Sequence, residues 1–102
     1  MGVSKKYLSD NELCRVTFTL PAGLSKTAES ANVVGDFNNW SITANPMKRR
    51  KNGQFAVSID LPANSEYQFR YLMDGNQWST DDKADAVVPA PFADQYNAVV
   101  KV

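Results

Sequence analysis

The sequence predicts an all-β protein, an immunoglobulin-like antiparallel sandwich of about seven strands. Apolar and polar residues alternate with a period of two along much of the chain, and no stretch has the 3.6-residue period of an amphipathic helix. Turn-forming residues interrupt these runs at intervals of about 8 to 12 residues, as in small sandwiches. The length of 102 residues is that of one domain with one core.

The first clear strand runs from Cys14 to Leu20 and ends before Pro21. Val16, Phe18 and Leu20 share one face of it, which we expect to point into the core. The residues before this strand show no such alternation. We therefore expect residues 1–12 to form a flexible N-terminal arm and residues 13–102 to form a single module.

Three further strands are predicted over residues 31–35, 47–51 and 54–61. The last two are separated by Asn52-Gly53, a pair that favours a tight hairpin because both residues tolerate positive φ. Phe55, Val57, Ile59 and Leu61 alternate along the fourth strand and predict its buried face.

The next strand, residues 66–73, has two distinct faces. Its core face is predicted to carry Tyr67, Phe69, Tyr71 and Met73, and its other face Gln68, Arg70 and Leu72. The turn signal Asp74-Gly75-Asn76 then leads to Trp78. Residues 79–95 are expected to be irregular, and residues 96–102 to form the closing strand.

The composition argues against several classes of function. The 11 basic and 11 acidic residues cancel, so no overall charge attracts nucleic acid or an anionic membrane. The basic run Lys48–Lys51 could contact phosphate, but in a short strand it fits better as protection of a sheet edge. No segment is apolar enough to span a membrane or to serve as a secretory signal, and the lone Cys14 fits a reducing compartment. We expect a cytoplasmic protein.

Catalysis is not predicted. The chain has no histidine and no glycine-rich phosphate loop, which excludes histidine-based triads and most zinc sites. The local concentration of carboxylates at Asp81, Asp82 and Asp85 fits turn formation or a solvated surface better than a catalytic pair. We therefore expect no enzyme activity, no metal and no cofactor.

Trp40 and Trp78 are the strongest functional candidates, because both lie where a strand meets a turn. Each ring alone could equally plug one end of the sandwich. By alternation, Arg70 lies on the face opposite the core, and Asn97 shares the parity of Val99. Aromatic rings beside a guanidinium and an amide suit the C–H faces and hydroxyl groups of a pyranose sugar.

The runs Val33–Trp40, Pro46–Arg50, Gly53–Leu61 and Tyr67–Trp78 together resemble the family-48 carbohydrate-binding module. This family includes the glycogen-binding domain of the AMP-activated kinase β subunit and the N-terminal early-set domain of branching enzymes and isoamylases. The resemblance covers roughly residues 14–102. It implies non-catalytic binding of α-1,4-glucan such as glycogen, starch or maltooligosaccharides.

The resemblance also implies roles for particular residues. Trp40 and Trp78 match the two rings that stack on successive glucose units, Arg70 stands in place of a lysine, and Asn97 matches a hydrogen-bonding asparagine. Between Trp78 and Asn97, where family members carry an apolar residue and a threonine, the candidates are Phe92 and Gln95.

Two hypotheses remain open at this point. In the first, the module binds cytoplasmic α-glucan through Trp40, Trp78, Arg70 and Asn97. In the second, it is an early-set interaction domain that docks on a protein partner, such as a glucan-metabolising enzyme, and does not bind sugar itself.

Overall fold

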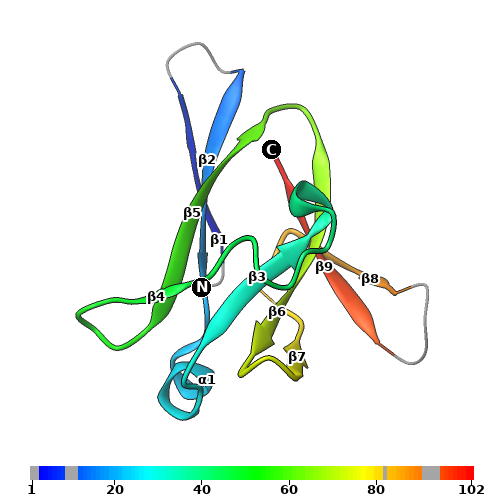
Figure 1. The fold of residues 1–102 in the computed structure, drawn as a ribbon. Coiled ribbons are helices and arrows are strands. Elements are labelled where there is room, and N and C mark those ends of the chain that lie inside the picture. The colour runs from blue at the N-terminus through cyan, green and yellow to red at the C-terminus, as the bar shows by residue number, and fades with distance from the viewer. Residues whose placement is uncertain (1–2, 9–11, 82, 91–94) are drawn as a thin grey trace.

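The computed structural model describes residues 3–8, 12–81, 83–90 and 95–102. Within them, two antiparallel sheets face each other (Figure 1). The first sheet has the order β1-β2-β5-β4, formed by Val3–Tyr7, Leu13–Thr19, Phe55–Pro62 and Lys48–Arg49. The second has the order β3-β6-β9-β8, formed by Ala31–Gly35, Glu66–Met73, Tyr96–Lys101 and Ala86–Pro89, with β7 (Gln77–Ser79) also paired to β6. The predicted all-β sandwich is confirmed.

The core lies between the sheets and follows the predicted alternation. Val16 and Phe18 on the first sheet and Leu20 directly after β2 are fully buried, as are Phe69 and Tyr71 on the second sheet. The rings of Phe18 and Phe69 meet edge to face, with centroids 4.9 Å apart. Contacts of this kind across the two sheets fix which face of each strand remains outside.

Several strands lie where the sequence predicted them. The bounds of β3 and β6 are those predicted, β2 and β5 are shifted by one residue, and β4 is shorter than expected. The turn before β5 uses only one of the two expected residues in the left-handed region, Gly53 with φ +89°. The N–H of Gly53 donates to the carbonyl of Arg50 and so closes this turn.

The structure corrects the prediction for the N-terminal segment. Within residues 1–12, expected to be a flexible arm, Val3–Tyr7 forms the edge strand β1 and pairs antiparallel with β2. Four of its five residues are exposed. A strand with no buried face needs no alternation of apolar and polar residues, so the sequence carries no signal for it. Pairing through the backbone holds such a strand regardless of its side chains.

Two further elements were not expected. Ala86–Pro89, predicted to be irregular, forms the edge strand β8 and pairs with β9. Ala22–Thr27 forms the short helix α1, six residues long. In the part of the chain that the structure describes, no helix has the length and apolar character needed to cross a membrane.

The basic run has a structural role at one position. β4 lies at a sheet edge, as predicted for this run. The guanidinium of Arg49 donates to the carbonyls of Ser25 and Ala28 at the end of α1 and lies 4.4 Å from the ring centroid of Phe55. Arg49 therefore ties the helix to the first sheet.

Candidate functional site

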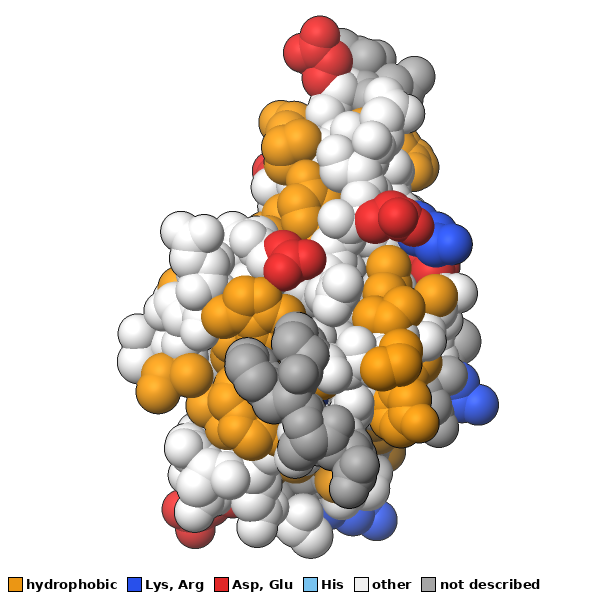
Figure 2. Space-filling model, turned by 90° about the vertical axis from the view of Figure 1, so that its right-hand side faces the viewer, with side chains coloured by type: hydrophobic (Ala, Val, Ile, Leu, Met, Phe, Trp, Pro, Cys, Tyr) orange, Lys and Arg blue, Asp and Glu red, His pale blue; other side chains and the backbone are white. Residues whose placement is uncertain are grey.

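An open groove of about 800 Å³ lies on the outer side of the second sheet. Figure 2 looks onto the side of the molecule that carries β8 and β9 and shows hydrophobic side chains gathered on it. Exposed apolar regions of this kind often mark binding sites. Nine described residues line the groove: Asp36, Trp40, Ile42, Gln68, Arg70, Trp78, Ala90, Gln95 and Asn97.

Strand β6 supplies the floor of the groove. Gln68 and Arg70 alternate with the buried Phe69 and therefore point away from the core. On one edge of β6, Phe69 pairs with β9 and Tyr71 pairs with β7. Arg70 therefore lies at the point along β6 where the neighbouring strand changes from β9 to β7. The side chains of β7 and of the start of β9 thereby meet on either side of Arg70.

Trp40 is placed by a tight turn after β3. This turn, a 3₁₀ segment at Asp36–Asn38, ends in two consecutive left-handed residues, Asn39 (φ 56°) and Trp40 (φ 58°). The N–H of Trp40 donates to the carbonyl of Gly35 (2.8 Å), and its indole Nε1 donates to Oδ1 of Asp36 (2.9 Å). A left-handed conformation is uncommon for a bulky residue, and these two bonds hold it.

Gly35 is required where β3 enters this turn. A Cβ at this position would lie 2.4 Å from the carbonyl oxygen of Gln68 and 2.8 Å from the Cβ of Phe69. The backbone of β3 can approach β6 only because no side chain stands between them. The close approach brings the Trp40 turn next to the outer face of β6.

Trp78 and Arg70 form a second wall. Trp78 lies on β7 and is 41% exposed, and the guanidinium carbon of Arg70 lies 5.2 Å from the centroid of its ring. Burial lowers the pKa of Arg70 from its ordinary value. The Nε of Arg70 is buried and has no hydrogen-bond partner among the described residues.

A chain of hydrogen bonds connects the polar residues of the groove. Oδ2 of Asp36 accepts a bond from the backbone N–H of Gln68 (2.8 Å). Oε1 of Gln68 accepts one from Nδ2 of Asn97 (3.0 Å), although Asn97 is only 4% exposed. The Trp40 ring is thus connected through Asp36 to β6, and β6 through Gln68 to β9.

The sequence-predicted candidates come together here. Trp40, Trp78, Arg70, Asn97 and Gln95 all line the one groove. Phe92 lies outside the described residues.

Four lining residues were not predicted: Asp36, Gln68, Ile42 and Ala90. Gln68 lies two residues before Arg70 and therefore on the same face of the strand, so strand alternation could have predicted it. Asp36 was part of the motif around Trp40, but its bond to a ring four residues away depends on the left-handed turn. Ile42, 51% exposed, carries no signal in the sequence.

The acidic cluster after Trp78 has structural roles at the positions that the structure describes. Asp81 is 2% exposed, accepts a hydrogen bond from the hydroxyl of Tyr71 (2.8 Å) and accepts another from the backbone of Lys83. Burial, reinforced by this carboxylate, raises the pKa of Tyr71. Asp81 therefore forms a turn, as predicted, but is not on a solvated surface. Among the described residues, no three Cys, Asp or Glu side chains are grouped so as to hold a metal ion.

Comparison with known proteins shows a family and a relative that the chain resembles. Residues 11–89 match the model of a family described as "Carbohydrate-binding module 48 (Isoamylase N-terminal domain)". Over 58 residues the chain is 31% identical to a 1,4-alpha-glucan-branching enzyme, chloroplastic/amyloplastic, from Oryza sativa subsp. japonica. That alignment covers 50% of this chain and 7% of the branching enzyme.

Proposed function

Since the chain belongs to the carbohydrate-binding module 48 family, we propose that it binds α-1,4-glucan in the groove between Trp40 and Trp78. Glycogen, starch and maltooligosaccharides share this linkage. The proposal makes the chain a non-catalytic module. The branching enzyme that it resembles acts on an α-glucan by its name, which agrees with this choice of ligand.

One observation carries the proposal: both tryptophans lie outside the core and line one groove with Arg70. Had either ring plugged an end of the sandwich, it would have been buried, whereas Trp78 is 41% exposed and Trp40 half-buried. A pyranose presents C–H groups to an aromatic ring, and this contact excludes water from both surfaces.

The polar groups between the rings suit the hydroxyls of the same sugar. The guanidinium of Arg70 supplies donors, and the amides of Gln68 and Asn97 supply both donors and acceptors. The charged side chains that line the groove are Arg70 and Asp36. One positive and one negative side chain suit a neutral ligand better than an ion.

The test is binding of maltoheptaose measured by isothermal titration, together with pull-down on insoluble amylose. Trp40→Ala and Trp78→Ala are each expected to weaken binding by about 1 to 3 kcal/mol, roughly 5- to 150-fold in Kd. Tyr7→Ala is the matched control, because Tyr7 is also an exposed aromatic residue (48%) but lies on β1 of the other sheet.

Thermal unfolding of each variant shows whether a loss of binding reflects the groove or the fold. Failure of the wild-type protein to bind either glucan would contradict the proposal. Binding by both tryptophan variants that is as tight as binding by the wild type would also contradict it. In either case, docking on a glucan-metabolising enzyme would become the better hypothesis.

A further inference from the structure

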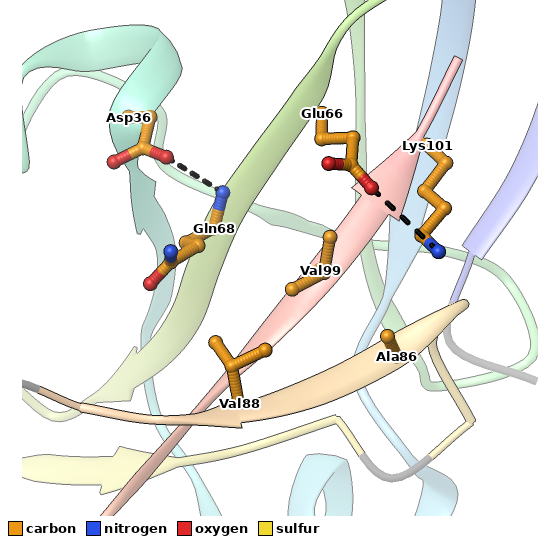
Figure 3. Close-up of a pocket in the computed structure, with 7 residues that line it drawn as sticks. All are labelled: Asp36, Glu66, Gln68, Ala86, Val88, Val99 and Lys101. Atoms are coloured by element: carbon orange, nitrogen blue, oxygen red, sulfur yellow. Dashed lines mark hydrogen bonds and ion pairs between the residues drawn. The ribbon is translucent and has the colours of Figure 1, made fainter.

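A second hollow, of about 290 Å³, lies beside the tryptophan groove and shares Asp36 and Gln68 with it. Figure 3 shows the hollow over the outer face of β6, β9 and β8. Apart from the two shared residues, everything that lines it lies beyond the groove: Glu66, Ala86, Val88, Val99 and Lys101.

Strand register makes the two hollows continuous. Arg70, Gln68 and Glu66 are alternate residues of β6 on its outer face, so neighbours in this series are about 7 Å apart. Arg70 lines the groove, Gln68 lines both hollows and Glu66 lines only the second. A chain molecule that follows β6 away from Arg70 therefore passes from one hollow into the other.

The neighbouring strands extend the same surface sideways. Val99 of β9 is paired with Gln68, and Ala86 of β8 is paired with Val99. Because paired residues of an antiparallel sheet point to the same face, these side chains form an apolar floor next to the Gln68 amide. Val88, paired with Asn97, joins this floor to the tryptophan groove.

The rim of the second hollow is polar and open. Glu66 and Lys101 are paired across β6 and β9, and Oε1 of Glu66 lies 3.6 Å from Nζ of Lys101. Their side chains are 65% and 56% exposed, so both are accessible to a ligand. The carboxylate accepts hydrogen bonds and the ammonium group donates them, and their charges cancel.

These features select one kind of ligand. A neutral molecule with hydroxyl groups at its edges and C–H groups on its faces matches a charge-balanced rim over an apolar floor. The described residues that line this hollow include no aromatic ring, so it lacks the stacking surface of the groove. Its contribution is expected to add to that of the tryptophans and not to replace it.

We propose that the second hollow binds further glucose units of the same α-glucan chain, beyond those that stack on Trp40 and Trp78. This inference rests on the proposed function of the tryptophan groove. Gln68, which lines both hollows and whose amide is oriented by Asn97, contacts the sugar units on either side of the junction.

The experiment compares a short and a long ligand, maltotriose and maltoheptaose, by isothermal titration. The double variant Glu66→Ala/Lys101→Ala removes the rim of the second hollow. The double variant Arg15→Ala/Asp60→Ala is its matched control, because Arg15 and Asp60 form a similar exposed cross-strand ion pair between β2 and β5 on the other sheet.

In the wild-type protein, maltoheptaose is expected to bind more tightly than maltotriose. The Glu66/Lys101 variant is expected to bind maltotriose as the wild type does and to lose roughly two- to tenfold in affinity for maltoheptaose, the range for the loss of one hydrogen bond. The Arg15/Asp60 control is expected to bind both ligands as the wild type does. A longer chain also gains affinity from its greater number of equivalent positions in the groove, but this gain persists in both variants.

The extension is overturned if the Glu66/Lys101 variant keeps the full wild-type preference for maltoheptaose, or if the wild-type protein binds the two ligands equally. Both results would leave the tryptophan groove intact as a short binding site. Absence of wild-type binding to both ligands would instead overturn the proposed function itself.

Discussion

The side chain of Asp36 joins two parts of the groove. One of its carboxylate oxygens accepts the indole N–H of Trp40, and the other accepts the backbone N–H of Gln68. The ring of Trp40 is half-buried. We infer that Asp36 orients this ring for its ligand.

Replacing Asp36 is expected to weaken glucan binding without removing a stacking ring. Asp36→Ala loses both acceptors and should cost about 1 kcal/mol of binding free energy. Asp36→Asn keeps an acceptor for one bond but places an N–H group against a donor in the other. Its glucan affinity should therefore lie between that of Asp36→Ala and that of the wild type.

The measurement is titration with maltoheptaose, combined with the indole N–H resonance of Trp40 in NMR spectra. A positioning role predicts that this resonance shifts or broadens in Asp36→Ala before any ligand is added. An unchanged resonance together with unchanged affinity would contradict it.

At the level of single residues, the sequence predicted the groove in part. Trp40 and Trp78 were found because large rings beside turns are conspicuous, and Arg70 because strand alternation places it outside the core. Asp36 was not found, because its bonds depend on a turn with two consecutive left-handed residues. Alternation identifies which face a residue occupies but not which loop folds over that face.

Helix α1 and strand β4 are held together by Arg49. Its guanidinium donates to the carbonyls of Ser25, Ala28 and Gly53 and packs against the ring of Phe55. A six-residue helix has little stability of its own, so its attachment depends on contacts of this kind.

Arg49→Ala is expected to lower the free energy of unfolding by about 1 to 3 kcal/mol, because it leaves carbonyls at the end of the helix without their donors. Arg50→Ala is the control, since Arg50 is the next residue of the same basic run and, like Arg49, is exposed. Its replacement should change stability by less than about 0.5 kcal/mol. Urea unfolding of both variants measures the difference. Equal effects of the two substitutions would contradict a structural role for Arg49.

Among the strands, those that face the core on one side were predicted and those at the edges were not. β3 and β6 have buried residues at regular positions, which the sequence shows directly. β1 is mostly exposed, and β8 alternates only between half-buried and exposed residues. Edge strands of this kind are held by backbone pairing, which leaves little trace in the pattern of side chains.

The two sheets are also connected by an ion pair at one side of the sandwich. Nζ of Lys5, on β1, lies 2.6 Å from Oδ2 of Asp85, and the same oxygen accepts the backbone N–H of Lys101 on β9. Burial raises the pKa of Asp85, but the hydrogen bonds and positive charges of Lys101 and Lys5 outweigh it. The pKa therefore lies below its ordinary value.

A carboxylate with a lowered pKa stabilises the folded state at pH values above its pKa in the unfolded chain, and this contribution is lost as the pH falls through the folded pKa. Asp85→Asn should therefore destabilise the protein at pH 7, by about 1 kcal/mol. The difference between the wild type and the variant should shrink as the pH falls through the lowered pKa and Asp85 becomes protonated. Urea unfolding at several pH values measures both effects. A difference between the two proteins that is the same at neutral and at acid pH would contradict the linkage.

The fold of the whole molecule was predictable because its core obeys one simple rule, alternation along strands such as β2 and β6. The contact of Lys5 with Asp85 was not predictable, because the two residues are 80 positions apart. Lys5 lies on β1 and Asp85 directly before β8, two strands that were themselves unpredicted. Long-range pairing of this kind is specified by the folded sheets and by no local signal.

The change of neighbour along β6 at Arg70 has a thermodynamic consequence. The walls of the groove come from β7, the start of β9 and the turn after β3, segments that meet only once the second sheet has formed. An unfolded or partly paired chain therefore has no groove to offer. Any ligand that occupies it draws the population toward the folded state by mass action, so that occupancy and conformational stability are two measurements of the same equilibrium.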